Sequence, residues 1–128
     1  FRRALVMAAA AAVSLVPLPA SAALHVGAIY GFWRTPDGGR IEIHPCGDML
    51  CGHIRDDGID DGKPTHAGHL LLQALHYQGA LTWAGGTVRN PRDNRAYRAK
   101  LRLMNGNQLK LTGCAWIFGG SQVWTRIE

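Results

Sequence analysis

Two cysteines and two histidines form the most reactive pattern in the chain, His44-x-Cys46-x4-Cys51-x-His53. If the flanking residues pair as a β-hairpin, Cys46 lies directly opposite Cys51 on the two strands. Cα atoms at opposed positions are about 4.5–5.5 Å apart, a distance that a disulfide can bridge. The same pairing places all four side chains on one face, and two Cys with two His match a tetrahedral zinc set. Oxidised cysteines cannot ligate a metal. We expect the disulfide, with His44 and His53 as the weaker candidates for a metal.

A third cysteine, Cys114, is left over in any pairing of the three. Its position beside Ala115 and Trp116 favours a buried thiol in the core. Two alternatives stay open, namely free thiols throughout or a bond from Cys114 to Cys46 or Cys51. Neither alternative requires a cofactor, and we expect none.

The segment 56–76 holds further residue types that bind metals. Its aspartates are Asp56, Asp57, Asp60 and Asp61, and its histidines are His66, His69 and His76. The aspartate spacing does not match an EF-hand loop, so a solvated acidic loop with surface histidines beside it is expected.

Signatures of catalysis are missing from the sequence. It has no Gly-x-Ser-x-Gly elbow and no glycine-rich phosphate loop. Glu42, the one glutamate within the expected fold, alternates outward. We expect no enzymatic activity.

Basic residues gather in one stretch, at Arg89, Arg92, Arg95, Arg98, Lys100 and Arg102. They could contact an anionic ligand or phosphate-rich lipid, or form a solvated face that blocks edge pairing. The chain carries a formal net charge of +5. Losing Arg2 and Arg3 leaves 12 basic and 9 acidic residues, a net charge of about +3, which implies no nucleic-acid partner.

Short runs of alternating apolar and polar residues predict β-strands. The clearest is 97–103, with Arg98, Lys100 and Arg102 on one face and Tyr97, Leu101 and Leu103 on the other. An Asn-Gly turn at 105–106 separates it from 109–112. Other expected strands are 29–34, 40–44, 50–55, 81–89 and 122–127. Residues 90–94 read as a turn, and 70–75 fit a short helix or a strand equally well.

The N-terminal segment reads as a secretory signal peptide. Arg2 and Arg3 precede an apolar run, and Ala20-Ser21-Ala22 resembles a cleavage site. The run is too short to span a bilayer comfortably. We expect residues 1–22 to be removed, leaving one domain over 23–128 in the periplasm or outside the cell.

Several short motifs follow in order: Gly31-Phe32-Trp33, Cys46, Cys51-Gly52, Gly85-Gly86, Asn90-Pro91, Tyr97, Gly113-Cys114 and Trp124-Thr125-Arg126. Over residues 28–127 the chain resembles the bacterial secreted family called domain of unknown function 2147. The resemblance implies a small lipocalin-like β-barrel without established chemistry. In barrels of the lipocalin type, a Trp of the first strand plugs one end and an Arg of the last strand covers its ring, which assigns barrel closure to Gly31, Trp33, Trp124 and Arg126. The turn at 90–94 departs from the family pattern, with Arg92 for an acid and Asn94 for a glycine.

We therefore expect an all-β, antiparallel meander barrel of seven or eight strands. Its expected function is to bind a small apolar or amphipathic ligand among inward-facing side chains. The expected lining is Trp33, Ile41, Ile43, Ile54, Trp83, Tyr97, Leu101, Leu109 and Leu111. The alternative is a filled barrel that acts as an envelope interaction protein, through the basic hairpin or the Asp-rich loop.

Overall fold

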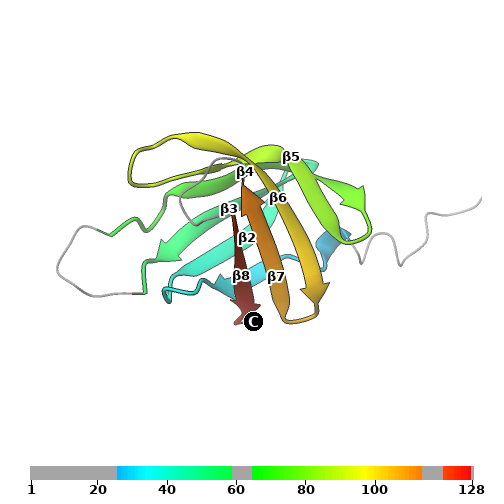
Figure 1. Ribbon diagram of the computed structural model, residues 1–128, viewed down its shortest axis with the longest axis horizontal. Helices are drawn as coiled ribbons and strands as arrows, with labels where there is room; N and C mark the ends of the chain where they lie inside the picture. Colours follow the sequence, from blue (N-terminus) through cyan, green and yellow to red (C-terminus); the bar gives the residue numbers. More distant parts are fainter. Residues whose placement is uncertain (1–25, 59–64, 114–119, 128) are drawn as a thin grey trace, which may run out of the picture.

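The chain forms a closed barrel of eight antiparallel strands in sequence order (Figure 1). The computed structural model describes residues 26–58, 65–113 and 120–127. The strands are β1 (Gly31–Arg34), β2 (Arg40–Cys46), β3 (Met49–Asp56), β4 (Leu70–Gly79), β5 (Thr82–Arg89), β6 (Ala96–Asn105), β7 (Gln108–Gly113) and β8 (Ser121–Arg126). Because β8 pairs with β1, the sheet closes on itself. The predicted antiparallel barrel is confirmed.

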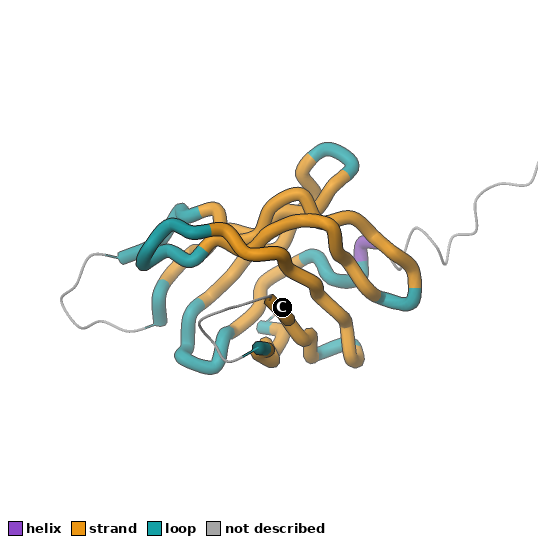
Figure 2. Tube along the Cα trace, turned by 45° about the horizontal axis from the view of Figure 1, so that its top comes forward, coloured by secondary structure: helices purple, strands orange, loops and turns teal. Residues whose placement is uncertain are grey.

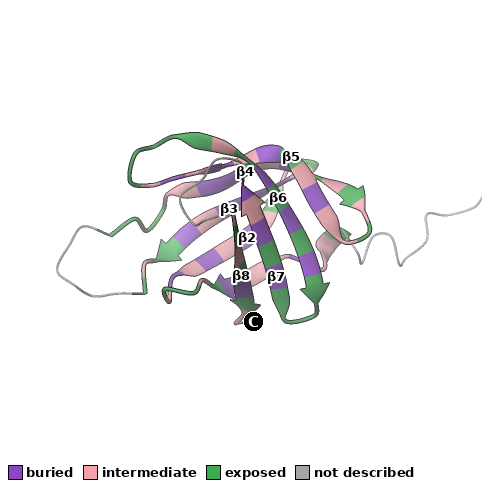
Figure 3. Cartoon of the chain, in the orientation of Figure 1, coloured by how far each residue is buried: buried purple, intermediate pink, exposed green. Residues whose placement is uncertain are grey.

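Alternating burial explains strands β6 and β7. Leu101 and Leu103 are buried while Lys100 and Arg102 are exposed, and the banding is visible in Figure 3. Asn105 pairs with Gln108, so the turn consists of Gly106 and Asn107, one residue later than the Asn-Gly pair. The Asn105 side chain accepts the Asn107 N–H at 2.8 Å, which stabilises the turn.

The ambiguous segment 70–75 belongs to strand β4. Leu72 pairs with Gly52 and Leu75 with Leu50, so two residues of β4 oppose one residue of β3. This bulge includes Ala74, whose φ is 63°. Two buried leucines thus lie three residues apart in a strand, a spacing that resembles a helix.

The first and last strands meet at the closure of the barrel. Trp33 is fully buried, and its indole N–H donates to Ile29 O at 2.9 Å. The Arg126 guanidinium lies over the Trp33 ring, 4.3 Å from its centroid, and donates to Tyr30 O at 3.0 Å and Ala28 O at 2.5 Å. A cation over an indole face contributes about 0.5–2 kcal/mol. These contacts hold residues 28–30 across one end of the barrel.

The other end of the barrel carries longer connections. The 35–39 turn, the described parts of the β3–β4 connection (57–58 and 65–69) and the 90–95 loop lie at the left in Figure 1, while residues 26–30 lie at the right. Figure 2 shows the same grouping from a second direction. The end with the longer connections is called the open end, and the end covered by residues 26–30 is called the plugged end.

Candidate binding site

Most of the inward-facing side chains form one packed core. Eight of the nine residues predicted to line a cavity are between 0 and 7% exposed: Trp33, Ile41, Ile43, Ile54, Trp83, Leu101, Leu109 and Leu111. Side chains with so little exposure contact one another and their neighbours rather than open space. Tyr97 packs against this core but is only half-buried.

Tyr97 borders an open hollow of about 700 Å³ on the β5–β6 hairpin. The lining consists of Gly85, Gly86, Thr87, Ala96, Tyr97 and Arg98. The volume falls within the range of small-molecule sites, roughly 300–1,000 Å³. The set comprises an aromatic residue, a hydroxyl-bearing residue, a basic residue, an alanine and two glycines. Among the described residues, the lining holds no carboxylate, imidazole or thiol.

A bulge in β5 creates the hollow. Trp83 pairs with Leu101 and Gly86 with Ala99, so two residues of β5 oppose one residue of β6. Gly85 within the bulge has φ 85°, a conformation that costs a glycine little. A Cβ on Gly86 would lie 2.1 Å from Gln73 O, so only glycine fits there. Gly85 is exposed and carries no side chain, whereas Gly86 is buried against the β4 backbone.

The 90–95 loop holds basic residues in place beyond the hollow. Asn90 is 5% exposed, its N–H donates to Arg95 O at 2.8 Å, and its side chain accepts the Arg92 N–H at 2.9 Å. Asn94 has φ 61°, which asparagine tolerates better than most residues. Asparagine can therefore stand where the family pattern has glycine.

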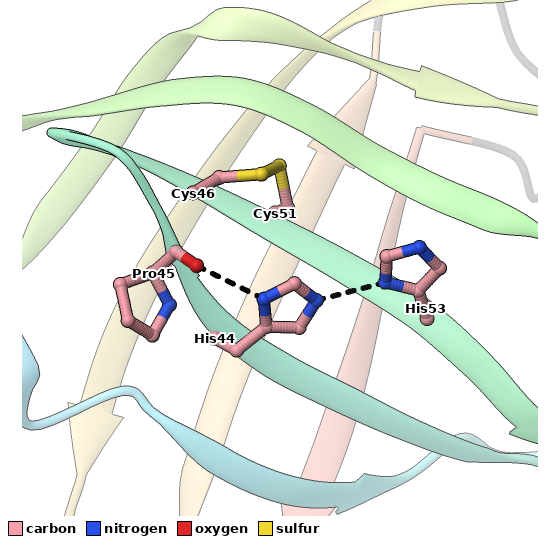
Figure 4. The surroundings of a disulfide bond; sticks show 5 residues. All are labelled: His44, Pro45, Cys46, Cys51 and His53. Carbon is pink, nitrogen blue, oxygen red and sulfur yellow. Dashed lines mark hydrogen bonds between the residues drawn. A yellow bond between two sulfur atoms is a disulfide. The ribbon is translucent and has the colours of Figure 1, made fainter.

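The disulfide between Cys46 and Cys51 is confirmed, with Cα atoms 5.6 Å apart (Figure 4). The predicted register is wrong, because Cys46 pairs with Met49 and Cys51 with His44. A two-residue turn at Gly47-Asp48 replaces the expected four-residue loop, so the disulfide crosses the hairpin diagonally. Its short covalent loop limits the expected stabilisation to about 2 kcal/mol.

His44 and His53 contact each other on the same hairpin (Figure 4). His44 Nε2 lies 2.8 Å from His53 Nδ1, and His44 Nδ1 lies 3.0 Å from Pro45 O. A carbonyl can only accept, so the neutral His44 ring carries its proton on Nδ1. His44 Nε2 then accepts from His53 Nδ1–H. Burial lowers the pKa of His53 below its ordinary value of 6.5, and the neighbouring His44 and Arg55 lower it further.

This histidine pair is expected to make the fold less stable in mild acid. Because the pKa of His53 is lower in the folded chain, the unfolded chain binds more protons as the pH falls through 6.5. The free energy of unfolding should therefore decrease between pH 7 and pH 5. Denaturant titrations of the wild type and His53→Gln test this, since the variant should show a shallower decrease. An equal pH dependence in both proteins would contradict the assignment.

The other candidate metal ligands engage separate partners. Oxidised Cys46 and Cys51 cannot complete a set with the two histidines. His66 contacts Asp57, with Nδ1 3.3 Å from Oδ2, while His69 Nε2 lies 3.1 Å from Arg89 O. Among the described residues, no group of three or more His, Cys, Asp or Glu could hold a metal ion. Asp60, Asp61 and Cys114 lie outside the described residues.

Comparison with solved structures places the fold among small barrels. HP1028 from Helicobacter pylori, a protein of the lipocalin family, aligns with a TM-score of 0.66 and 16% identity, covering 78% of this chain and 83% of its own. A redesigned β-barrel aligns with a TM-score of 0.51 and 18% identity, covering 81% and 96%. At these identities the likeness concerns the fold. Comparison with curated proteins gave no match.

The family model for an uncharacterised protein conserved in bacteria, DUF2147, matches residues 31–126. The chain belongs to the DUF2147 family. In this DUF2147 barrel, Tyr97 is the one residue of the hollow that belongs to the predicted ligand lining. Arg98 was assigned to the basic hairpin, and Gly85-Gly86 served only as a family motif. Consecutive glycines inside a strand are typical of a bulge or a close backbone approach, and this pattern could have identified the site.

Proposed function

We propose that this DUF2147 protein is an exported, non-enzymatic binding module for a small amphipathic molecule. The hollow beside Tyr97 is the observation that carries the proposal. An apolar part of the ligand lies on the Tyr97 ring and the Gly85-Gly86 backbone, and an anionic part faces the Arg98 guanidinium. The packed core beneath supplies a rigid floor, so the ligand binds at the surface of the barrel and not among the buried side chains.

Two features support the absence of catalysis and the exported location. In the part of the chain that the structure describes, the lining of the hollow lacks a carboxylate, imidazole or thiol that would serve as acid, base or nucleophile. The Cys46–Cys51 disulfide is typical of oxidising compartments and agrees with a cleaved N-terminal signal. No helix in the described part of the chain is long and apolar enough to span a bilayer.

A pair of fluorescent dyes tests the ligand class. 1-Anilinonaphthalene-8-sulfonate and N-phenyl-1-naphthylamine share an aromatic body, and only the first carries a sulfonate. We expect one site for both dyes, and Tyr97→Ala should weaken both about tenfold because the ring is a main apolar contact. Tyr77→Ala, at a half-buried tyrosine near the plugged end, is the matched control and should leave both affinities unchanged.

The charge of the ligand is tested by a second pair of variants. Arg98→Gln should weaken the sulfonate dye and spare the neutral dye, since only the sulfonate is attracted by the guanidinium. Lys110→Gln removes the same charge from an exposed position that does not line the hollow and should change neither affinity. Equal binding of both dyes to wild type and Tyr97→Ala would refute the site.

A further inference from the structure

The outer surface of the barrel is divided by charge. No carboxylate occurs in β5, β6, β7 or β8. Four exposed cations point outward from β6 and β7, namely Arg98, Lys100, Arg102 and Lys110. We call these four residues the basic face. On β2 and β3, by contrast, Arg40 pairs with Asp56 and Arg55 with Glu42.

Cations of the basic face stand directly opposite each other. Arg102 of β6 pairs in register with Lys110 of β7. Lys100 lies on β6, two residues before Arg102. Like charges at opposed positions of antiparallel strands destabilise the pair. Within the described residues, none of the four cations forms an ion pair that would offset this repulsion. A multivalent anionic partner would remove the cost.

Exposed apolar side chains accompany these cations. Met104 is 44% exposed and lies two residues after Arg102, where the β6–β7 register shifts. Val123 is 40% exposed and pairs with Lys110. The cross-strand row Thr82, Arg102, Lys110 and Val123 therefore runs from β5 to β8. Cations mixed with exposed apolar side chains suit the boundary between lipid headgroups and acyl chains.

We propose that the basic face docks on a bilayer surface that carries anionic lipid headgroups. Its cations lie along the phosphates, and Met104 and Val123 enter the interfacial region. The ion-paired wall of β2 and β3 lies on the other side of the barrel and faces away from the lipid. Because Arg98 also lines the hollow, a docked barrel holds its ligand site close to the membrane.

Vesicle cosedimentation tests the docking. Every variant is produced by export from the same bacterial host. All samples therefore carry the same N-terminus, and differences in binding come from the substitutions. We expect binding to phosphatidylcholine vesicles that contain phosphatidylglycerol, little binding to pure phosphatidylcholine, and release at high salt. Arg102→Glu with Lys110→Glu should lower the partition coefficient about 30-fold or more, since each cation near such a surface contributes about fivefold.

The matched control carries the same charge change on the other wall. Arg40→Glu with Arg55→Glu should lower the partition coefficient less than about threefold. Met104→Ser with Val123→Ser removes the two exposed apolar side chains and should lower the partition coefficient severalfold. Circular dichroism verifies that each variant is folded. Equal losses in both charge-reversed variants would overturn the proposal, because net charge alone would explain binding. Tighter binding to a short single-stranded oligonucleotide than to the vesicles would also overturn it, in favour of a nucleic-acid partner.

Discussion

Replacing Trp33 with alanine is expected to lower the free energy of unfolding by about 3–5 kcal/mol. The Trp33 side chain is fully buried, so its removal leaves a cavity that the closed sheet cannot easily collapse. The substitution also removes the indole N–H bond to Ile29 O and the face on which the Arg126 guanidinium lies. Chemical denaturation followed by far-ultraviolet circular dichroism measures the loss.

A double-mutant cycle separates closure of the barrel from simple loss of volume. Arg126→Gln should be destabilising alone and cost less in the Trp33→Ala background, because the cation–ring contact is then already absent. The coupling free energy should be about 0.5–2 kcal/mol. Trp83→Ala with Arg126→Gln is the control pair, and its effects should add. Additivity in the Trp33 cycle would contradict the role assigned to Arg126.

Replacing Gly86 with alanine is expected to destabilise the barrel by about 3 kcal/mol, at the upper end of the range for overpacking. The added Cβ would lie 2.1 Å from Gln73 O and 2.6 Å from Ala74 C, both backbone atoms of β4. A backbone contact cannot be relieved by a rotamer change, so β4 and β5 must separate. The same denaturation experiment measures this, and dye binding should weaken because the hollow lies on the displaced strand.

Gly106→Ala is the matched control for this substitution. A Cβ on Gly106 would meet no atom within 4 Å, and its stability should stay within about 0.5 kcal/mol of the wild type. If Gly86→Ala were as stable as Gly106→Ala, the close approach of β4 and β5 would be wrong.

Local patterns in the sequence predicted much of the barrel. The alternation in 97–103 and the turn after it predicted strand β6, its pairing with β7, and the burial of Leu101 and Leu103. Alternation with a period of two is a property of a single strand, so it can be recognised locally. The Cys46–Cys51 bond was also predictable, since a short hairpin brings the two cysteines together and the expected export favours oxidation.

Features that depend on the register between distant strands were not predictable in the same way. The bulge at Ala74 is set by the pairing of β4 with β3, and it made 70–75 resemble a helix. The hollow needs the β5 bulge, whose partner strand is β6, and no local pattern separates Tyr97 from the eight buried inward residues. Packing against the whole barrel decides which inward side chain stays accessible.

Native mass spectrometry of the protein exported by a bacterial host tests the ligand-binding proposal most directly, with a denatured sample of each protein beside it. The wild type should carry an adduct of a few hundred daltons only in the native spectrum, and its denatured mass should lack the two hydrogens lost in the disulfide. Tyr97→Ala should lose the adduct and keep the same denatured mass apart from the substitution. A wild type without any adduct, or an equal adduct on Tyr97→Ala, would contradict a binding site in the hollow.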